Sequence, residues 1–149
     1  MTDDALPPPL ADIRQDFLGL PEPDRLQLLL EFSHGLPEMP ARVAEHPELQ
    51  ERVAECQSPV FIVVEVDADD VVTMHATAPP ESPTTRGFAA ILVEGLTGLH
   101  ADAVLGVPDD FPRSIGLTRA VSPLRIAGMA GMLGRVKRQV RDRRGRRAP

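Results

Sequence analysis

The chain of 149 residues has no tryptophan, no tyrosine and only one cysteine, Cys56. A single cysteine cannot form an internal disulfide bond, so a reducing compartment and a cytoplasmic location are the simpler expectation. The acidic start, Met1 to Ala5, lacks the basic and apolar regions of a signal peptide, which favours the same location. The aromatic residues are five phenylalanines, too few to suggest stacking platforms for nucleic-acid bases.

Several classes of function lack their usual sequence signals. No apolar run approaches the roughly 20 residues that span a bilayer, so we expect no membrane partner. Cys56 and the four histidines do not form the short-spaced cluster of a metal site, and we expect neither a metal nor a stably bound cofactor. Glycine-rich phosphate loops are also absent, because the clustered glycines lie inside a helical pattern: Gly128, Gly131 and Gly134. Three glycines disfavour a helix, so we expect them to allow close approach of another element.

Hydrophobic periodicity and turn residues predict the order α-α-β-β-α-α-α, which is typical of an α+β fold. Residues 36–55 are expected to form a long, proline-broken connector with a short helical turn at 41–45. The strands are expected to form a short antiparallel sheet of about three strands, packed by helices. The expected elements are helices at 10–18 and 23–34, strands at 60–66 and 71–77, and helices at 84–99, from 108 and from 123.

The length suits one domain. We predict a single domain over residues 10–141, after a disordered arm at 1–9 and before a basic, flexible tail at 142–149. Although the net charge is −6, eight basic residues and one acid lie from Arg135 onward. Such a tail could bind nucleic acid, but without interleaved aromatic residues we favour a solvated helix end whose cations suit the helix dipole.

Cys56 lies between polar residues, just before the apolar strand expected at 60–66. Pro59 cannot donate a hydrogen bond to a strand ladder, so the sulfur should lie on a loop at the edge of the strand. A lone cysteine is more often a small buried filler than a nucleophile, but a polar loop position favours the nucleophile. A reactive thiol needs a cationic neighbour, and the candidates are Arg125 and Arg86, each at the start of a predicted helix.

Recognisable motifs then extend this interpretation. From about Leu10 to Arg141 the chain resembles the SufE family, sulfur acceptors that serve cysteine desulfurases in iron–sulfur cluster assembly. The most specific element is Cys56-Gln57-Ser58 before a hydrophobic strand, which is similar to the family's Gly-Cys-Gln-Ser motif. Three other segments also resemble family segments: the Leu-Pro ending of 28–37, the stretch from Glu81 to Arg86-Gly87, and Ser122-Pro123-Leu124-Arg125.

The resemblance implies a SufE/IscU-like fold and a persulfide relay. Cys56 would take sulfur from a cysteine desulfurase, a pyridoxal phosphate enzyme, stimulate that enzyme, and pass the sulfur from a transient persulfide to an iron–sulfur scaffold. Arg125 would tune or orient the thiol, and the expected partner contacts are Gln57, Ser58, Glu81 and Arg86. The protein would be a sulfurtransferase-like accessory rather than a stand-alone enzyme. Between encounters the thiol would tuck toward an apolar cavity, and the desulfurase would swing the loop outward.

Glu55 departs from the family pattern, which usually has glycine before the cysteine. Glycine would permit an unusual backbone and a free-swinging loop, so Glu55 leaves the mobility of this loop an open question. Its negative charge should raise the pKa of the neighbouring thiol.

Two other hypotheses stay open beside the relay. The chain could be a non-catalytic adaptor that binds a desulfurase while Cys56 is structural, which slow alkylation of the native thiol would favour. It could instead bind nucleic acid through the tail at 135–147, in which case binding would depend strongly on salt and disappear on truncation. We place the relay above both.

Overall fold

Proline opens the long helices, as the sequence predicts, because its fixed backbone angle suits the first helical turn and its missing N–H has no partner there. The computed structural model describes residues 6–146. Its long helices are α1 (Pro8–Leu18), α2 (Glu22–His34), α4 (Pro83–Leu96) and α6 (Pro123–Arg146). Short helical segments lie between them: α3 (Ala41–Ala44), η2 (Pro47–Leu49), α5 (Ala101–Leu105) and η3 (Phe111–Arg113). The hydroxyl of Ser122 accepts from the Arg125 N–H at 3.3 Å, which confirms the predicted start of α6.

The predicted hairpin forms the centre of a three-stranded antiparallel sheet with the order β1-β2-β3. Its strands are β1 (Glu51–Arg52), β2 (Phe61–Val66) and β3 (Val72–Thr77). The register pairs Ile62 with Ala76 and Val64 with Met74, and these four side chains are buried in the core. The α+β prediction and the short sheet are therefore confirmed, whereas the strand β1 lies inside the segment expected to be a connector.

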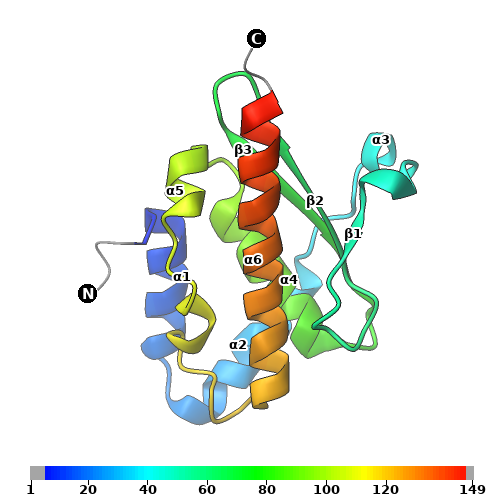
Figure 1. Ribbon diagram of the computed structural model, residues 1–149. Helices are drawn as coiled ribbons and strands as arrows, with labels where there is room; N and C mark the ends of the chain where they lie inside the picture. The colour runs from blue at the N-terminus through cyan, green and yellow to red at the C-terminus, as the bar shows by residue number, and fades with distance from the viewer. Residues whose placement is uncertain (1–5, 147–149) are drawn as a thin grey trace.

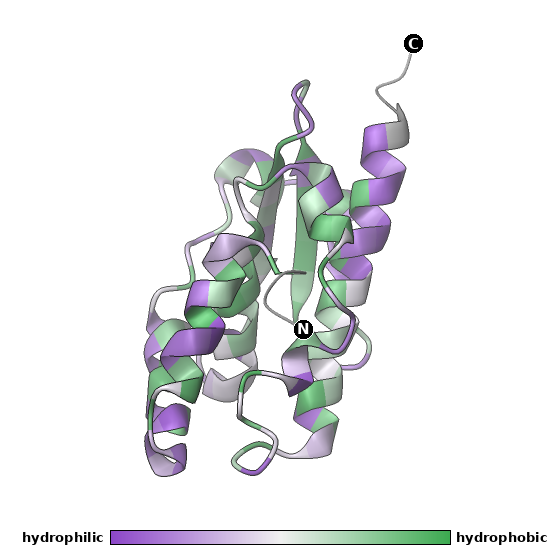
Figure 2. Ribbon diagram, turned by 90° about the vertical axis from the view of Figure 1, so that its left-hand side faces the viewer, coloured by the Kyte–Doolittle hydropathy of each residue, from purple (hydrophilic) through white to green (hydrophobic). Residues whose placement is uncertain are grey.

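The helices stack on the sheet in layers. α6 packs on β2 and α4 packs on β3, while α1 and α2 pack on α4. Figure 1 shows α6 running the length of the molecule, with α1 on one flank and β1 on the other. One hydrophobic core joins these layers. Figure 2 shows the strands largely hydrophobic and the last turns of α6 largely hydrophilic.

Both ends of the described chain are more ordered than the sequence suggested. The arm predicted at 1–9 is already helical from Pro8, and Leu6 is buried, because proline suits the first turn and Leu6 joins the core. Residues 1–5 lie outside the described residues. At the other end, α6 continues to Arg146, so most of the flexible tail predicted at 142–149 is helical; residues 147–149 lie outside the described part.

Some basic residues of α6 form ion pairs with other elements. Lys137, although buried, donates to the Val107 carbonyl and to the Asp109 carboxylate, the latter at 2.7 Å. Arg144 donates to Asp102 of α5 at 2.7 Å. Arg138 and Arg141 are exposed, so this part of the helix is partly paired and partly solvated. The pairing reduces the charge available for nucleic acid.

Candidate functional site

Cys56 lies in the loop that joins β1 to β2. The Val53 N–H donates to the Val60 carbonyl at 2.9 Å and closes the neck of this loop. Inside it, the Cys56 N–H donates to the Val53 carbonyl at 3.1 Å. The predicted place of the sulfur, on a loop at the edge of a strand, agrees with this geometry.

The Cys56 side chain points inward, although its loop neighbours are largely exposed. Cys56 is only 7% exposed, whereas Glu55 and Gln57 are exposed. Its sulfur rests against Gly128 of α6, where an added Cβ would lie 3.0 Å from Sγ. A side chain at position 128 would therefore push on the sulfur. The predicted close approach to the glycines of this helix holds at Gly128.

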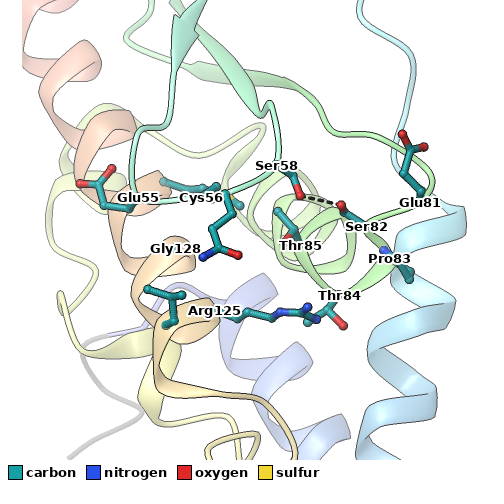
Figure 3. A pocket seen from close by; sticks show the side chains of 13 residues that line it. Glu55, Cys56, Ser58, Glu81, Ser82, Pro83, Thr84, Thr85, Arg125 and Gly128 are labelled. Carbon is teal, nitrogen blue, oxygen red and sulfur yellow. Dashed lines mark hydrogen bonds between the residues drawn. The ribbon is translucent and has the colours of Figure 1, made fainter.

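The sulfur borders a cavity of about 290 Å³ between the loop, the start of α4 and the first turns of α6. The cavity wall combines polar groups from the loop and α4 with apolar groups from α6. Figure 3 shows these side chains around the opening. They are Glu55, Cys56, Gln57, Ser58, Glu81, Ser82, Pro83, Thr84, Thr85, Leu124, Arg125, Gly128 and Met132. The expected cavity beside the cysteine is present, but it is less apolar than expected because α4 contributes hydroxyl groups.

The inward position of the Cys56 side chain, here called the closed position of the loop, disfavours the thiolate form. Burial and, to a smaller extent, the negative charge of Glu55 raise the pKa of the Cys56 thiol, while the Arg135 cation lowers it, and together they bring it to about 11. The predicted influence of Glu55 on this pKa is thus confirmed in direction. Since the thiolate is the reactive form, the closed loop holds Cys56 protonated and unreactive near neutral pH.

Glu55 fastens the loop to α6 on one side of Cys56. Arg135 donates to the Glu55 carboxylate at 2.7 Å and to Glu51 at 3.0 Å. The hydrogen bond from Arg135 lowers the pKa of the Glu55 carboxyl. Sequence reasoning missed Arg135 because it counted this residue with the basic tail. The available signal was helical spacing, since Gly128, Gly131 and Arg135 recur at three and four residues and share one face.

Ser58 fastens the loop to α4 on the other side of Cys56. Its hydroxyl lies 2.5 Å from the hydroxyl of Ser82, the residue before α4, as the dashed line in Figure 3 shows. The Ser82 side chain makes no capping hydrogen bond to its own helix. The loop is therefore held by two side-chain contacts that flank the cysteine.

The other residues singled out from sequence fall into two groups. Gln57, Glu81 and Arg125 line the cavity with Cys56, and Figure 3 shows the Arg125 side chain extending toward Thr84. Arg86 does not line it, because its guanidinium donates to the carbonyls of Ser33 and Ala78 at 2.9 and 2.6 Å. Arg86 thus ties α4 to neighbouring elements. The charges that shift the pKa of the thiol belong to Glu55 and Arg135. The role of Arg125 in orienting the thiol and the partner contacts of Gln57, Ser58, Glu81 and Arg86 stay predictions.

Within residues 6–146, no three His, Cys, Asp or Glu side chains come together as a candidate metal site. No helix in that range is long and apolar enough to cross a membrane.

Comparison with known proteins identifies the family to which the chain belongs. A family model described as "SufE: Fe-S metabolism associated domain" matches residues 11–140. The chain is 46% identical over 138 residues to an uncharacterized SufE-like protein of Mycobacterium tuberculosis, which covers 93% of this chain and 95% of that protein. It is 29% identical over 129 residues to SufE-like protein 1, chloroplastic/mitochondrial, of Arabidopsis thaliana, covering 86% of this chain and 33% of that protein.

A solved structure agrees with these relatives. The solution structure of a hypothetical protein from Thermus thermophilus matches with a TM-score of 0.83 and 38% identity, over 94% of this chain and 98% of that one. The two chains therefore share one fold over most of their length. The chain is a member of the SufE family, which implies a role in iron–sulfur metabolism.

Proposed function

We propose that this protein accepts persulfide sulfur from a cysteine desulfurase on Cys56, stimulates that enzyme, and relays the sulfur toward iron–sulfur cluster assembly. The observation that carries the proposal is the place of the sulfur: it is covered, beside a cavity, yet it sits on a loop fastened by only two side-chain contacts. A buried filler within a rigid strand or helix would lack such a loop.

The reaction is an exchange between a thiolate and a persulfide. The Cys56 thiol loses its proton, and its sulfur attacks the terminal sulfur of the persulfide on the desulfurase cysteine. A new S–S bond forms on Cys56, the old S–S bond breaks, and the desulfurase cysteine leaves as thiolate. No external oxidant or reductant is needed, because the transferred sulfur keeps its oxidation state. A thiolate on the scaffold side would later take that sulfur in the same way.

The loop would hold the sulfur in its closed position and exchange it in an open position. In the closed position the cavity has room for one additional sulfur atom, and Cys56 itself is only 7% exposed. The raised pKa of the thiol makes that position a poor place for attack, so transfer would take place with the loop open. The desulfurase, by binding the opened loop, would supply the free energy for opening.

The decisive experiment measures sulfur uptake. Incubation with a cysteine desulfurase and free cysteine should add the mass of one sulfur atom, removable by reductant, and should raise the turnover of the desulfurase. The Cys56→Ser variant should fold normally and lose both effects. If stimulation survives in that variant, the relay is wrong and the adaptor hypothesis replaces it.

Alkylation of the free thiol does not separate these two hypotheses. A protonated, buried Cys56 should react slowly whether it serves as an acceptor or as a structural residue. Uptake of sulfur in the presence of the desulfurase is therefore the discriminating measurement, because only the relay requires a bond to form on Cys56.

A further inference from the structure

The Glu55 side chain lies against α6 at Gly131, in space that a side chain at position 131 would partly fill. A Cβ at position 131 would lie 2.7 Å from the Glu55 Cδ and 2.9 Å from its Oε1. The glutamate thus lies flat on the helix backbone, and its carboxylate meets Arg135 at 2.7 Å. By contrast, an added Cβ at Gly134, one turn along the same helix, would meet nothing within 4 Å.

This contact is adjacent to the reacting atom. Glu55 directly precedes Cys56, and Gly128, against which the sulfur rests, lies one turn before Gly131 on α6. If the glutamate leaves its site, its ion pair with Arg135 is lost, and this pair holds the residue directly before Cys56. The remaining side-chain restraint on the loop is the Ser58–Ser82 contact on the opposite side.

We propose that Glu55 is a positioning residue: seated on Gly131 and paired with Arg135, it holds the Cys56 loop closed until a partner displaces it. The inference deepens the proposed function and rests on it for its biological purpose. Its physical content, the closed loop of the free protein, can be measured without any desulfurase.

The Glu55–Arg135 ion pair is weak enough for a partner to displace it and open the loop. The Glu55 side chain is 46% exposed and that of Arg135 is 24% exposed, so water and salt screen the pair in part. Ion pairs of this kind typically change an equilibrium by about two- to fivefold. The loop would therefore open readily when a partner offers compensating contacts, and would be closed for most of the time otherwise.

The first test uses two glycines of the same helix. Gly131→Ala keeps both charges of the pair but removes the space for Glu55, whereas Gly134→Ala changes helix propensity equally and touches nothing. Alkylation of Cys56 in the free protein should be about two- to fivefold faster in Gly131→Ala than in the native protein. Gly134→Ala should react at the native rate.

The second test removes the charge and keeps the shape. In Glu55→Gln, alkylation should accelerate by about the same factor at low salt. Added salt should accelerate the native protein but not this variant. The charged residues that line the cavity are Glu55, Glu81 and Arg125. Arg135 of α6 and Glu51 of β1 act on the Glu55 carboxylate from outside it. Because only the negative charge of Glu55 is lost, the pH midpoint of alkylation should fall, a shift that a purely steric role would not produce.

The outcomes separate this inference from the proposed function. If Gly131→Ala and Glu55→Gln both react at the native rate, Glu55 does not hold the loop closed and the inference is overturned. If they react faster while no sulfur reaches Cys56 from a desulfurase, the restraint stands and the relay fails. If both hold, the two variants should also take up sulfur at lower protein concentration than the native chain, because less free energy is spent on opening.

Discussion

The two ends of the segment from β1 to the cysteine loop are held to α6 in different ways. At the base, the Glu51 carboxylate receives hydrogen bonds from Arg135, Arg138 and Gln139. At the tip, the Glu55 carboxylate receives a side-chain hydrogen bond from α6 only through Arg135 among the described residues. Both acids pair with the same helix, and they are only four residues apart. The base of the segment is therefore held to α6 by more hydrogen bonds than its tip, which is the arrangement that the proposed release of the tip would require.

Gln139 is central to the fixed base. Its Oε1 accepts from the Val64 N–H at 2.8 Å, and its Nε2 donates to Glu51 at 2.9 Å. β1 has two residues and ends before it reaches Val64, so the side chain of Gln139 supplies the acceptor that a longer strand would provide. A side chain of the last helix thereby completes the edge of the sheet.

The largest loss of stability is expected when the hydrogen bonds of Gln139 at the base of the loop are removed. Gln139→Leu keeps the volume but leaves the buried Val64 N–H without an acceptor, which should lower the free energy of unfolding by about 2 kcal/mol in denaturant titrations. Arg144→Gln is the matched control, because it breaks an exposed ion pair of α6 with Asp102 and should cost less than about 0.5 kcal/mol. If both variants lost the same free energy of unfolding, the hydrogen bonds of Gln139 would stabilise the protein no more than an exposed ion pair does.

A smaller, pH-dependent effect is expected at Glu51. Burial acts to raise the pKa of its carboxyl, but the hydrogen bonds from Gln139, Arg138 and Arg135 together outweigh burial and lower it. A lowered pKa contributes stability above the unfolded value near 4.5, and this is lost as the pH falls through the folded pKa.

Glu51→Gln should therefore lose about 1 kcal/mol at pH 7. Its stability should depend less on pH below about 4.5 than that of the native protein. Unfolding curves recorded across that range measure the difference. Glu55→Gln, at the tip, should cost less stability than Glu51→Gln at every pH, and the reverse order would contradict the contrast between base and tip.

The smallest effect on stability is expected at the second contact of the tip. Ser58→Ala removes the hydrogen bond to Ser82, and the freed Ser82 hydroxyl can cap α4 instead, so the free energy of unfolding should change by less than about 0.5 kcal/mol. Alkylation of Cys56 should accelerate by about twofold or less. If Ser58→Ala exposes the thiol more than Gly131→Ala does, the Ser58–Ser82 contact is the main restraint on the loop.

The sequence predicted secondary structure correctly where the residues of one segment determine it. The strand at 60–66 and the Ser122-Pro123 helix start were predictable, because an apolar β-branched run and a cap followed by proline each favour one local structure. The strand β1 was not, since two residues hold no periodicity and its pairing depends on β2. The continuation of α6 to Arg146 was missed for a similar reason, because its ion pairs join residues distant in the chain.

The features of the candidate site likewise fall into those that local sequence predicts and those that depend on tertiary contacts. The sequence alone established a single cysteine on a loop before a strand, a charge beside it that raises its pKa, and glycines spaced to admit another element. Only the tertiary structure showed that Arg135, 80 residues from Glu55, is the cation that meets this loop, and that Gly131 makes room for the glutamate. The physical reason is that burial and Coulomb interactions act through space, so their partners are decided by packing and not by order along the chain.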